Sequence, residues 1–299
     1  MSRKFLITGG EGFIGRNIKN YIISNGDAAQ TLDIGGDPDY RVSVTDFDSL
    51  MDIKEDFDGV FHLAAVTSPP QFEDDPLTGF EVNANGTLNV LEFARERNIK
   101  RVVLASSSAT YGNAQIMSTE EDFPKSYENI YPITKMVSEY LARYYFDQKG
   151  IECISLRYFN TYGSGENTKS QYASVVWRFV KALSKGERAV IYGDGEQKRD
   201  FIYVLDTARA SYLAMLHGKS GESYNIGTGV STTFNDIYAI VKEEMQSELE
   251  AEHVPNPFKN YQYFTQADMT KTRRDLGFIP EHDLRSGIRS MLQNDIRSI

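Results

Sequence analysis

The stretch KFLITGGEGFIG, residues 4–15, decides the fold of this chain. Its first part, Lys4–Thr8, is typical of a buried strand, and the glycines that follow form a turn into a helix. Glycines let the backbone approach a pyrophosphate closely, and the helix start adds N–H donors and a favourable dipole. The spacing is G-x-x-G-x-x-G and differs from the more common G-x-G-x-x-G. The stretch therefore predicts a dinucleotide-binding turn formed by Gly9, Gly12, Phe13, Ile14 and Gly15.

Short apolar runs alternate with helix-length segments through the first half of the chain. The strand candidates are Lys4–Thr8, Gln30–Ile34, Arg41–Val44, Gly59–Leu63, Arg101–Ala105 and Ile151–Arg157. Helical patterns lie at Leu77–Arg97 and Asn129–Gln148, whereas Gly35–Tyr40 is too short for a helix and predicts a tight connection. Strands that alternate with helices form right-handed crossovers and a parallel sheet covered on both faces. We expect an α/β fold of the Rossmann type, a doubly wound parallel sheet.

The alternation ends near Gly163, and the remainder predicts a smaller C-terminal lobe. Tyr224–Ile226 is a candidate for one more strand of the main sheet. Helical patterns cover Tyr172–Ser184, Phe234–Glu250 and His282–Ile296. We expect an NAD-binding Rossmann domain over residues 1–162, joined by a strand near 223–227, and a mainly substrate-binding lobe over residues 163–299.

Composition narrows the class of partners. The 299 residues carry a net charge of −10, without the basic excess that a binder of nucleic-acid phosphates needs. The single cysteine, Cys153, lies in the apolar run Ile151–Leu156, so it predicts a buried core residue and no internal disulfide. No apolar run reaches the roughly 18 residues of a membrane span. We expect a soluble cytoplasmic protein with no nucleic-acid partner and no membrane partner.

Asp33 closes the second predicted strand and bears on the choice of cofactor. A carboxylate at this place can accept hydrogen bonds from the adenosine ribose hydroxyls. The same charge repels a 2′-phosphate, so the position favours NAD over NADP. Arg41 follows closely in sequence and leaves NADP open as the alternative.

Three Tyr-x-x-x-Lys pairs occur, and one of them follows a hydroxyl-rich strand end. Tyr145/Lys149 lies at the far end of its helix, and Tyr238/Lys242 lies in the smaller lobe. Tyr131/Lys135 begins a helix that follows Ala105-Ser106-Ser107-Ser108, at the edge of the sheet where ligands bind. Tyr131 and Lys135 are therefore the candidate catalytic pair.

A tyrosine acts as a base near neutral pH only if its pKa falls well below the ordinary value near 10, a change of about 4 kcal/mol. Lys135 lies one helical turn from Tyr131 on the same face and can supply part of this change. The positive ring of an oxidised nicotinamide can supply more. A serine hydroxyl can hold the same substrate oxygen, but the sequence alone leaves open whether Ser106, Ser107 or Ser108 does so.

These motifs form part of a longer ordered series. Besides the glycine turn and Tyr131–Lys135, the series comprises His62-Leu63-Ala64-Ala65, Asn83 with Gly86-Thr87, Ser106–Gly112, Arg157–Gly163, Arg199-Asp200-Phe201-Ile202 and Tyr224–Gly227. Over nearly the whole chain the series resembles the extended short-chain dehydrogenases/reductases. More narrowly, it resembles the NAD-dependent epimerases and dehydratases of nucleotide sugars, the group that includes UDP-glucose 4-epimerases.

The resemblance implies roles for individual residues. It makes Ser107 the active-site hydroxyl, Tyr131 the acid/base and Lys135 a group that also contacts the nicotinamide ribose. It places Arg199 on the substrate diphosphate and Tyr192 near the nucleotide base. The implied cofactor is NAD, bound also by Asp33, Leu63, Ala64 and Ala65. The implied substrate-binding residues are Ser107, Ser108, Asn160, Tyr192, Arg199, Lys259 and Thr265.

Departures from the family pattern separate its branches. Ser108 and Ala109 stand where the 4,6-dehydratases carry an Asp-Glu pair, so dehydration is disfavoured. The segment Tyr261–Asp268 resembles both UDP-hexose 4-epimerases and ADP-heptose 6-epimerases, and Lys259 is the only cation near the place of a second diphosphate arginine. The resemblance implies that Thr265 stands at a position that is bulky in 4-epimerases restricted to unmodified hexoses, so its small side chain would leave room for an N-acetylated sugar.

We therefore predict an NAD-dependent epimerase of carbohydrate metabolism that inverts C4 of a UDP-hexose or UDP-N-acetylhexosamine through a 4-keto intermediate. The enzymatic alternatives are an ADP-heptose 6-epimerase and a nucleotide-sugar 4-ketoreductase. The non-enzymatic alternative is a dinucleotide-sensing regulator without turnover. The resemblance also implies a homodimer that forms through the predicted helices Leu77–Arg97 and Asn129–Gln148.

Overall fold

The computed structural model describes residues 2–67, 72, 74–112, 129–167, 173–257 and 262–295. In these residues a parallel sheet of seven strands has the order β10-β6-β5-β4-β1-β2-β3. The strands are β1 (Lys4–Thr8), β2 (Ala28–Asp33), β3 (Tyr40–Arg41), β4 (Gly59–His62), β5 (Arg101–Ser107), β6 (Glu152–Tyr158) and β10 (Ser223–Ile226). This arrangement confirms the predicted Rossmann-type fold, including the late return of a strand to the sheet.

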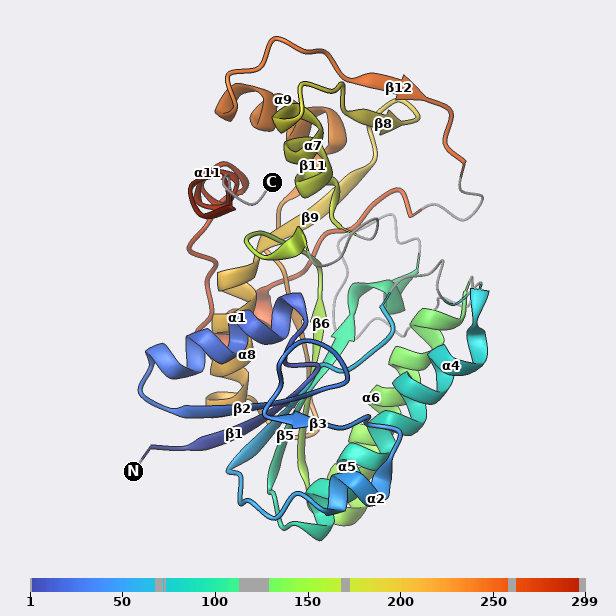
Figure 1. Cartoon of the computed structure of the whole chain (residues 1–299), viewed down its shortest axis with the longest axis vertical. Helices are drawn as coiled ribbons and strands as arrows, with labels where there is room; N and C mark the ends of the chain where they lie inside the picture. The colour runs from blue at the N-terminus through green and yellow to red at the C-terminus, as the bar shows by residue number, and fades with distance from the viewer. Residues whose placement is uncertain are drawn as a thin grey trace.

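Helices cover both faces of this sheet (Figure 1). On one face lie α1 (Phe13–Ser24) and α8 (Val204–His217), which pack against each other. On the other face lie α5 (Gly86–Glu96) and α6 (Ile130–Lys149), with the short α2 (Phe47–Met51) against α5. The predicted helix Leu77–Arg97 has three parts, because a π-helical turn, η1 (Glu81–Asn85), separates α4 (Pro76–Phe80) from α5.

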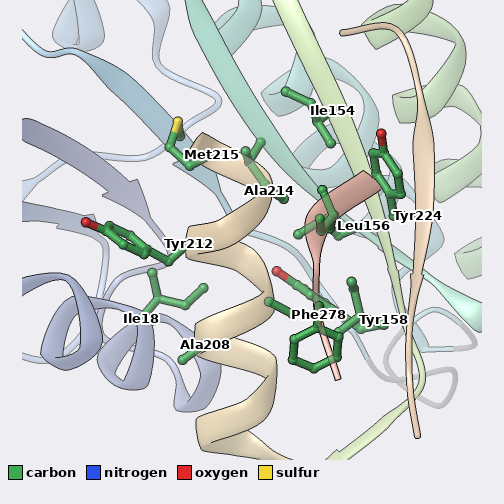
Figure 2. Close-up of a cluster of buried hydrophobic side chains, with 14 of the residues drawn as sticks. Ile18, Ile154, Leu156, Tyr158, Ala208, Tyr212, Ala214, Met215, Tyr224 and Phe278 are labelled. Carbon is green, nitrogen blue, oxygen red and sulfur yellow. The ribbon is translucent and has the colours of Figure 1, made fainter. Parts of the chain in front are cut away.

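A buried cluster joins the two halves of the chain. Figure 2 shows Ile154, Leu156 and Tyr158 of β6 packed against side chains of α8, among them Ala208 and Met215. Burial of one such aliphatic side chain contributes about 1.5–3 kcal/mol. Because β6 precedes residue 163 and α8 follows it, this core fixes the later segments on the sheet.

The second half adds two small sheets. One contains β7 (Asn160–Tyr162), β9 (Lys198–Tyr203) and β11 (Ser231–Thr233), and the other pairs β8 (Val190–Tyr192) with β12 (Glu252–Val254). The helices here are α7 (Val175–Ser184), α9 (Phe234–Glu244), α10 (Thr270–Leu276) and α11 (Leu284–Asp295). The apolar faces of α7, α9 and α11 form a second core with β8 and β9, whereas Leu276 of α10 joins the core around β6 and α8. The division into residues 1–162 and 163–299 stays a prediction.

Some expected bounds differ from the structure. The third strand has only Tyr40–Arg41, and α9 ends at Glu244, just before Gln246 takes a φ of +52°. The sequence did not predict β9 or α8. Both carry buried polar groups, such as Asp200 in β9 and Asp206 in α8, which hide the apolar periodicity.

Two predictions from composition can be compared with the structure. Cys153 is buried in the core, as predicted. Within the described ranges, no helix combines the length and the apolar character that a bilayer crossing requires.

Candidate active site

The glycine turn lies between β1 and α1, at the carboxyl edge of the sheet. Gly9 has a φ of +67°, and a Cβ atom there would lie 2.7 Å from the Ala64 backbone nitrogen. A Cβ on Gly15 would overlap the Gly9 carbonyl oxygen. Both positions therefore need glycine. Gly12 is the N-cap of α1, and no side chain in the described part of the protein caps it, so this helix start can hold an anionic group.

Asp33 lies beside this turn, at the end of β2. Its carboxylate accepts hydrogen bonds from the backbone N–H groups of Glu11 (3.0 Å), Ile34 (2.8 Å) and Gly35 (3.1 Å). Arg41 donates to the carbonyl oxygens of Ile34 (3.0 Å) and Gly36 (2.7 Å). The carboxylate therefore has a fixed place next to the turn, and Arg41 is occupied with the backbone of the β2–β3 connection.

The end of β4 borders the turn from the other side. The Leu63 N–H donates to the Thr8 carbonyl oxygen at 3.0 Å, and the Ala64 N–H donates to Thr8 Oγ1 at 3.3 Å. Leu63, Ala64 and Ala65 are all partly exposed. The three predicted cofactor-binding segments, namely the glycine turn, Asp33 and residues 63–65, therefore line one edge of the sheet.

Ser107, Tyr131 and Lys135 meet at the same edge. β5 extends through Ser107, whose hydroxyl accepts a hydrogen bond from the Ala109 N–H at 3.1 Å and caps the turn η2 (Ser108–Tyr111). Asn129 caps α6 by accepting the Tyr131 N–H at 3.0 Å. Lys135 Nζ lies 6.0 Å from the centroid of the Tyr131 ring and donates to the Ala105 carbonyl oxygen at 2.8 Å.

Burial changes the protonation of this group of side chains. It raises the pKa of Tyr131 above 10, and a hydrogen bond with the Ser107 side chain opposes that rise. The Phe72 ring, 5.9 Å from the Tyr131 ring, contributes to the burial. Burial lowers the pKa of Lys135 to about 8, against the opposing effect of the Glu139 charge. Tyr131 is therefore a neutral phenol at pH 7 in this state, with Ser107 as the serine that touches it.

The predicted substrate residues lie mainly around β9. Asn160 Nδ2 donates to the Asp200 carbonyl oxygen (3.0 Å) and to Thr265 Oγ1 (3.3 Å), and Thr265 also accepts the Asp200 N–H (3.2 Å). Arg199 is 7% exposed, and its guanidinium lies 5.9 Å from the Phe234 ring centroid. These contacts hold the amide and the guanidinium in fixed positions.

Two further substrate residues lie at different places in the described structure. Tyr192, the last residue of β8, is half-buried, and the Arg178 guanidinium lies 5.5 Å from its ring centroid. Ser108 is buried at the start of η2, next to Ser107. Lys259 lies outside the described residues.

Comparison with known proteins identifies the family. Residues 5–227 match the model of the NAD-dependent epimerase/dehydratase family. The chain belongs to this family. Over 96% of both chains it is 33% identical to a Methanocaldococcus jannaschii protein that carries a provisional UDP-glucose 4-epimerase name. It is 29% identical to an ADP-L-glycero-D-manno-heptose-6-epimerase of Alkalilimnicola ehrlichii, over 96% of each chain.

Solved structures of epimerases have the same fold. The UDP-glucose 4-epimerase of Thermotoga maritima with UDP-glucose is 29% identical, with a TM-score of 0.93 over 99% of both chains. A UDP-N-acetylglucosamine 4-epimerase of Methanobrevibacter ruminantium, in complex with UDP-N-acetylmuramic acid, is 29% identical with a TM-score of 0.92 and coverage of 100% and 99%. A Thermus thermophilus UDP-glucose 4-epimerase with NAD is 28% identical, with a TM-score of 0.90 and coverage of 99% and 100%.

The protein is thus an NAD-dependent nucleotide-sugar epimerase by family, and the glycine turn fits that cofactor. Side chains at Gly9 and Gly15 would fill the space where the turn closes on β4 and α1, and the uncapped start of α1 can hold a pyrophosphate. The three hydrogen bonds of the Asp33 carboxylate described above come from backbone N–H groups, so none of these three partners is a cation. The roles of the individual site residues in this epimerase stay predictions.

The sequence did not predict a buried polar network that lies beside the glycine turn. Thr8 Oγ1 lies 2.7 Å from His62 Nδ1, and His62 Nε2 lies 3.0 Å from Thr87 Oγ1, which donates to the Asn83 carbonyl oxygen. Because the Thr87 proton goes to Asn83, His62 donates from Nε2 and accepts at Nδ1. Burial, with a smaller effect of the Lys135 charge, lowers the pKa of His62 to about 3. These residues mark the family in sequence, but only the fold brings them together.

Proposed function

We propose that this epimerase inverts C4 of a UDP-linked hexose or N-acetylhexosamine through a 4-keto intermediate. One observation carries this proposal: Ser107, Tyr131 and Lys135 meet at the carboxyl edge of the sheet, beside the glycine turn. A phenol, a hydroxyl and an ammonium group in that arrangement suit proton transfer at a sugar hydroxyl. The two UDP-sugar 4-epimerase structures with the highest TM-scores given above support the substrate class.

In this mechanism Tyr131 Oη takes the proton of the C4 hydroxyl while Ser107 Oγ holds the same oxygen. When bound, NAD supplies the oxidising and then the reducing chemistry at the sugar carbon. Tyr131 returns the proton to the oxygen after the sugar has presented its other face, so the proton balance closes within one turnover. Lys135, fixed by the Ala105 carbonyl, places a positive charge beside the phenol and favours its ionised form.

Arg199 has the second role in this proposal. Its buried guanidinium would bind the diphosphate, which stays in place while the hexose turns about its link to the phosphate. Asn160, Tyr192, Ser108, Thr265 and Lys259 would bind the sugar and the base. The Thr265 hydroxyl already bonds to Asn160 and Asp200, so its contribution to the sugar pocket is through its small volume.

Nuclear magnetic resonance of the purified protein with single nucleotide sugars tests this function. UDP-glucose and UDP-N-acetylglucosamine are supplied separately, without added cofactor. We expect the galacto-configured product from at least one of them, and the faster substrate tests the prediction for Thr265. A protein that binds NAD and converts neither UDP-sugar would contradict the proposal.

ADP-heptose 6-epimerase is a second candidate, because the segment Tyr261–Asp268 resembles those enzymes and one relative carries that name. The same residues would then act at C6 of a heptose. Conversion of the ADP-linked and not of the UDP-linked sugar would favour this alternative. Net oxidation of the reduced cofactor would instead indicate the 4-ketoreductase.

We propose further that the enzyme is a homodimer. The helical layer of α4, α5 and α6 exposes large apolar side chains, namely Leu77, Phe80, Leu88, Tyr140 and Tyr144. Large apolar side chains exposed on neighbouring helices favour a protein interface there. The location in the cytoplasm and the place in carbohydrate metabolism stay predictions.

A further inference from the structure

Three consecutive residues at the end of β5 contact three successive turns of α6. The Ala105 carbonyl oxygen accepts the hydrogen bond of Lys135 Nζ, and the Ser107 side chain hydrogen-bonds to Tyr131. Between them, the Ser106 hydroxyl donates to Glu139. Tyr131, Lys135 and Glu139 are spaced i, i+4 and i+8, so they lie on one face of the helix. The contact of Ser106 with Glu139 involves none of the three proposed catalytic residues, yet it lies between the other two contacts on the strand.

The Glu139 carboxylate is almost fully occupied by hydrogen bonds. Its two oxygens accept Arg157 Nε at 2.9 Å and Arg157 Nη2 at 2.7 Å, in a bidentate pair. The Ser106 hydroxyl and, at 3.4 Å, the Ser223 hydroxyl donate to the same carboxylate. The exposed fractions of the Glu139 and Arg157 side chains are 12% and 5%. Bidentate pairs of this kind fix orientation as well as distance.

Arg157 extends this contact across the sheet. In the strand register Ser106 pairs with Arg157, and Arg157 pairs with Asn225, so the three lie in one row over β5, β6 and β10. Arg157 Nη1 donates to the Tyr111 hydroxyl at 2.9 Å, and that hydroxyl donates to Asn225 Oδ1 at 2.6 Å. Glu139 therefore links α6 to three neighbouring strands and to η2, the turn that Ser107 caps.

We propose that Glu139 is a positioning residue for the reaction: with Arg157 and Ser106 it fixes the end of β5, which carries Ser107 and the acceptor of Lys135, against the helix that carries Tyr131. A buried ion pair is weak evidence for stability, because desolvation offsets much of its attraction. Its value here is geometric. A displacement of about 1 Å at reacting groups can cost 10²-fold in rate, so a fixed strand–helix distance matters for catalysis.

Glu139 also acts on Lys135 through its charge. The titratable groups beside Lys135 in the described structure are Tyr131 and Glu139 of α6 and His62 of β4. Among these, the Glu139 carboxylate raises the pKa of Lys135, against the lowering by burial. Loss of this carboxylate should therefore lower the pKa of Lys135 further, so that Lys135 loses its proton closer to neutrality.

The direct test is Glu139→Gln in the full-length, NAD-containing enzyme. This substitution keeps the side-chain length and removes the charge. With UDP-glucose or UDP-N-acetylglucosamine, whichever the wild type converts, we expect kcat to fall by about 10-fold to 100-fold while KM stays within about threefold. The alkaline limb of kcat against pH should move to lower pH, and the content of bound NAD should stay that of the wild type.

Asp206→Asn is the matched control. Asp206 of α8 is a buried carboxylate paired with Arg209, on the face of the sheet opposite to α6. The control should lower the thermal unfolding temperature as Glu139→Gln does, but leave kcat and its pH profile unchanged. Equal losses of kcat in both variants, or no loss in folded Glu139→Gln, would show that Glu139 has only a structural role and would overturn the inference.

If Glu139→Gln does not fold, Ser106→Ala tests the same positioning role. This substitution removes the hydrogen bond from Ser106 to Glu139 without leaving a buried charge unpaired. We expect kcat to fall by about threefold to tenfold. Its control is Ser211→Ala, which removes an equally buried hydroxyl that is bonded to Tyr158 and Thr207 from the α8 side. Ser106→Ala with the kcat of the wild type would contradict the inference.

The inference rests on the proposed function, and a measurement without substrate separates the two. Isotope-labelled lysine allows titration of Lys135 by nuclear magnetic resonance, with its signal assigned from a Lys135→Arg variant. We expect a lower pKa of Lys135 in Glu139→Gln, and a smaller decrease in a folded Glu139→Asp. Either result would support the effect of the Glu139 carboxylate on Lys135 even if no UDP-sugar is converted. An unchanged pKa of Lys135 in these variants would contradict the effect of Glu139 on Lys135. The proposed epimerase function is tested separately, by the assay with UDP-sugars.

Discussion

Tyr131 is a neutral phenol in this structure, because burial raises its pKa. The sequence predicted that Lys135 lowers this pKa, but the ammonium group lies 6.0 Å from the ring centroid and donates to the Ala105 carbonyl. Burial is the largest effect on the pKa of this phenol, and the hydrogen bond with Ser107 opposes it. Further positive charge, which a bound oxidised nicotinamide provides, is therefore needed before Tyr131 can act as a base.

The pH dependence of kcat follows from the pKa values of Tyr131 and Lys135. Burial lowers the pKa of Lys135 to about 8, so its side chain is charged below that pH and neutral above it. We expect kcat to rise with pH as Tyr131 ionises and to fall above about pH 8 as Lys135 loses its proton. In Lys135→Arg the falling limb should disappear, since arginine keeps its charge. An identical falling limb in that variant would assign it to another group.

Arg199 should contribute to substrate binding and little to the chemical step. Arg199→Gln removes a charge from a buried site, and loss of a charge-assisted hydrogen bond costs about 1.5–3 kcal/mol. We expect KM for the nucleotide sugar to rise by about 10-fold to 100-fold with kcat within a few-fold of the wild type. Arg188→Gln is the control, because Arg188 is an exposed arginine of the same lobe that bonds only to backbone carbonyls in the described structure. A large fall in kcat at unchanged KM would contradict this role.

At the scale of elements, His62 holds β1, β4 and α5 together as a neutral side chain. Its folded-state pKa is about 3, below the ordinary 6.5, so the unfolded chain binds one more proton between these values. The free energy of unfolding should therefore fall by about 1.4 kcal/mol per pH unit as the pH drops through this window. His62→Gln should flatten this slope in denaturant unfolding, whereas His253→Gln, at an exposed position, should not. Equal slopes in wild type and His62→Gln would show that other groups cause the acid sensitivity.

The sequence predicted the elements that carry the proposed cofactor-binding and catalytic residues. The glycine turn, Asp33 at the end of β2 and Ser107 before α6 lie in strand–turn segments, where local pattern is informative. It did not predict β9 or α8, because buried polar residues such as Asp200 and Thr207 interrupt their apolar patterns. The networks of His62 and Glu139 were also missed, since they depend on strand register and helix packing between residues far apart in sequence.

At the scale of the whole molecule, the sheet and the smaller lobe share a core through α8 and β6 (Figure 2). The layer of α4, α5 and α6 carries exposed apolar side chains. The exposed apolar side chains of this helical layer support the proposed homodimer. We expect light scattering to give the mass of a dimer for the wild type. Tyr140→Glu with Tyr144→Glu should give a monomer, because it places like charges in the interface.

The control for the dimer is Ile279→Glu, which changes an equally exposed apolar residue elsewhere on the surface. It should leave the dimer intact. A monomeric wild type, or a double variant that stays dimeric, would contradict the assignment of this surface.

The most direct test of the central claim is Tyr131→Phe, measured by nuclear magnetic resonance of the sugar product together with the content of bound NAD. Tyr238→Phe is the control, because Tyr238 also precedes a lysine by four residues and its hydroxyl only donates to the Leu249 carbonyl in the described part of the smaller lobe. We predict that Tyr131→Phe retains NAD and loses epimerisation by at least about 10²-fold, while Tyr238→Phe keeps the wild-type rate. Wild-type turnover by Tyr131→Phe would contradict the claim that this phenol moves the proton.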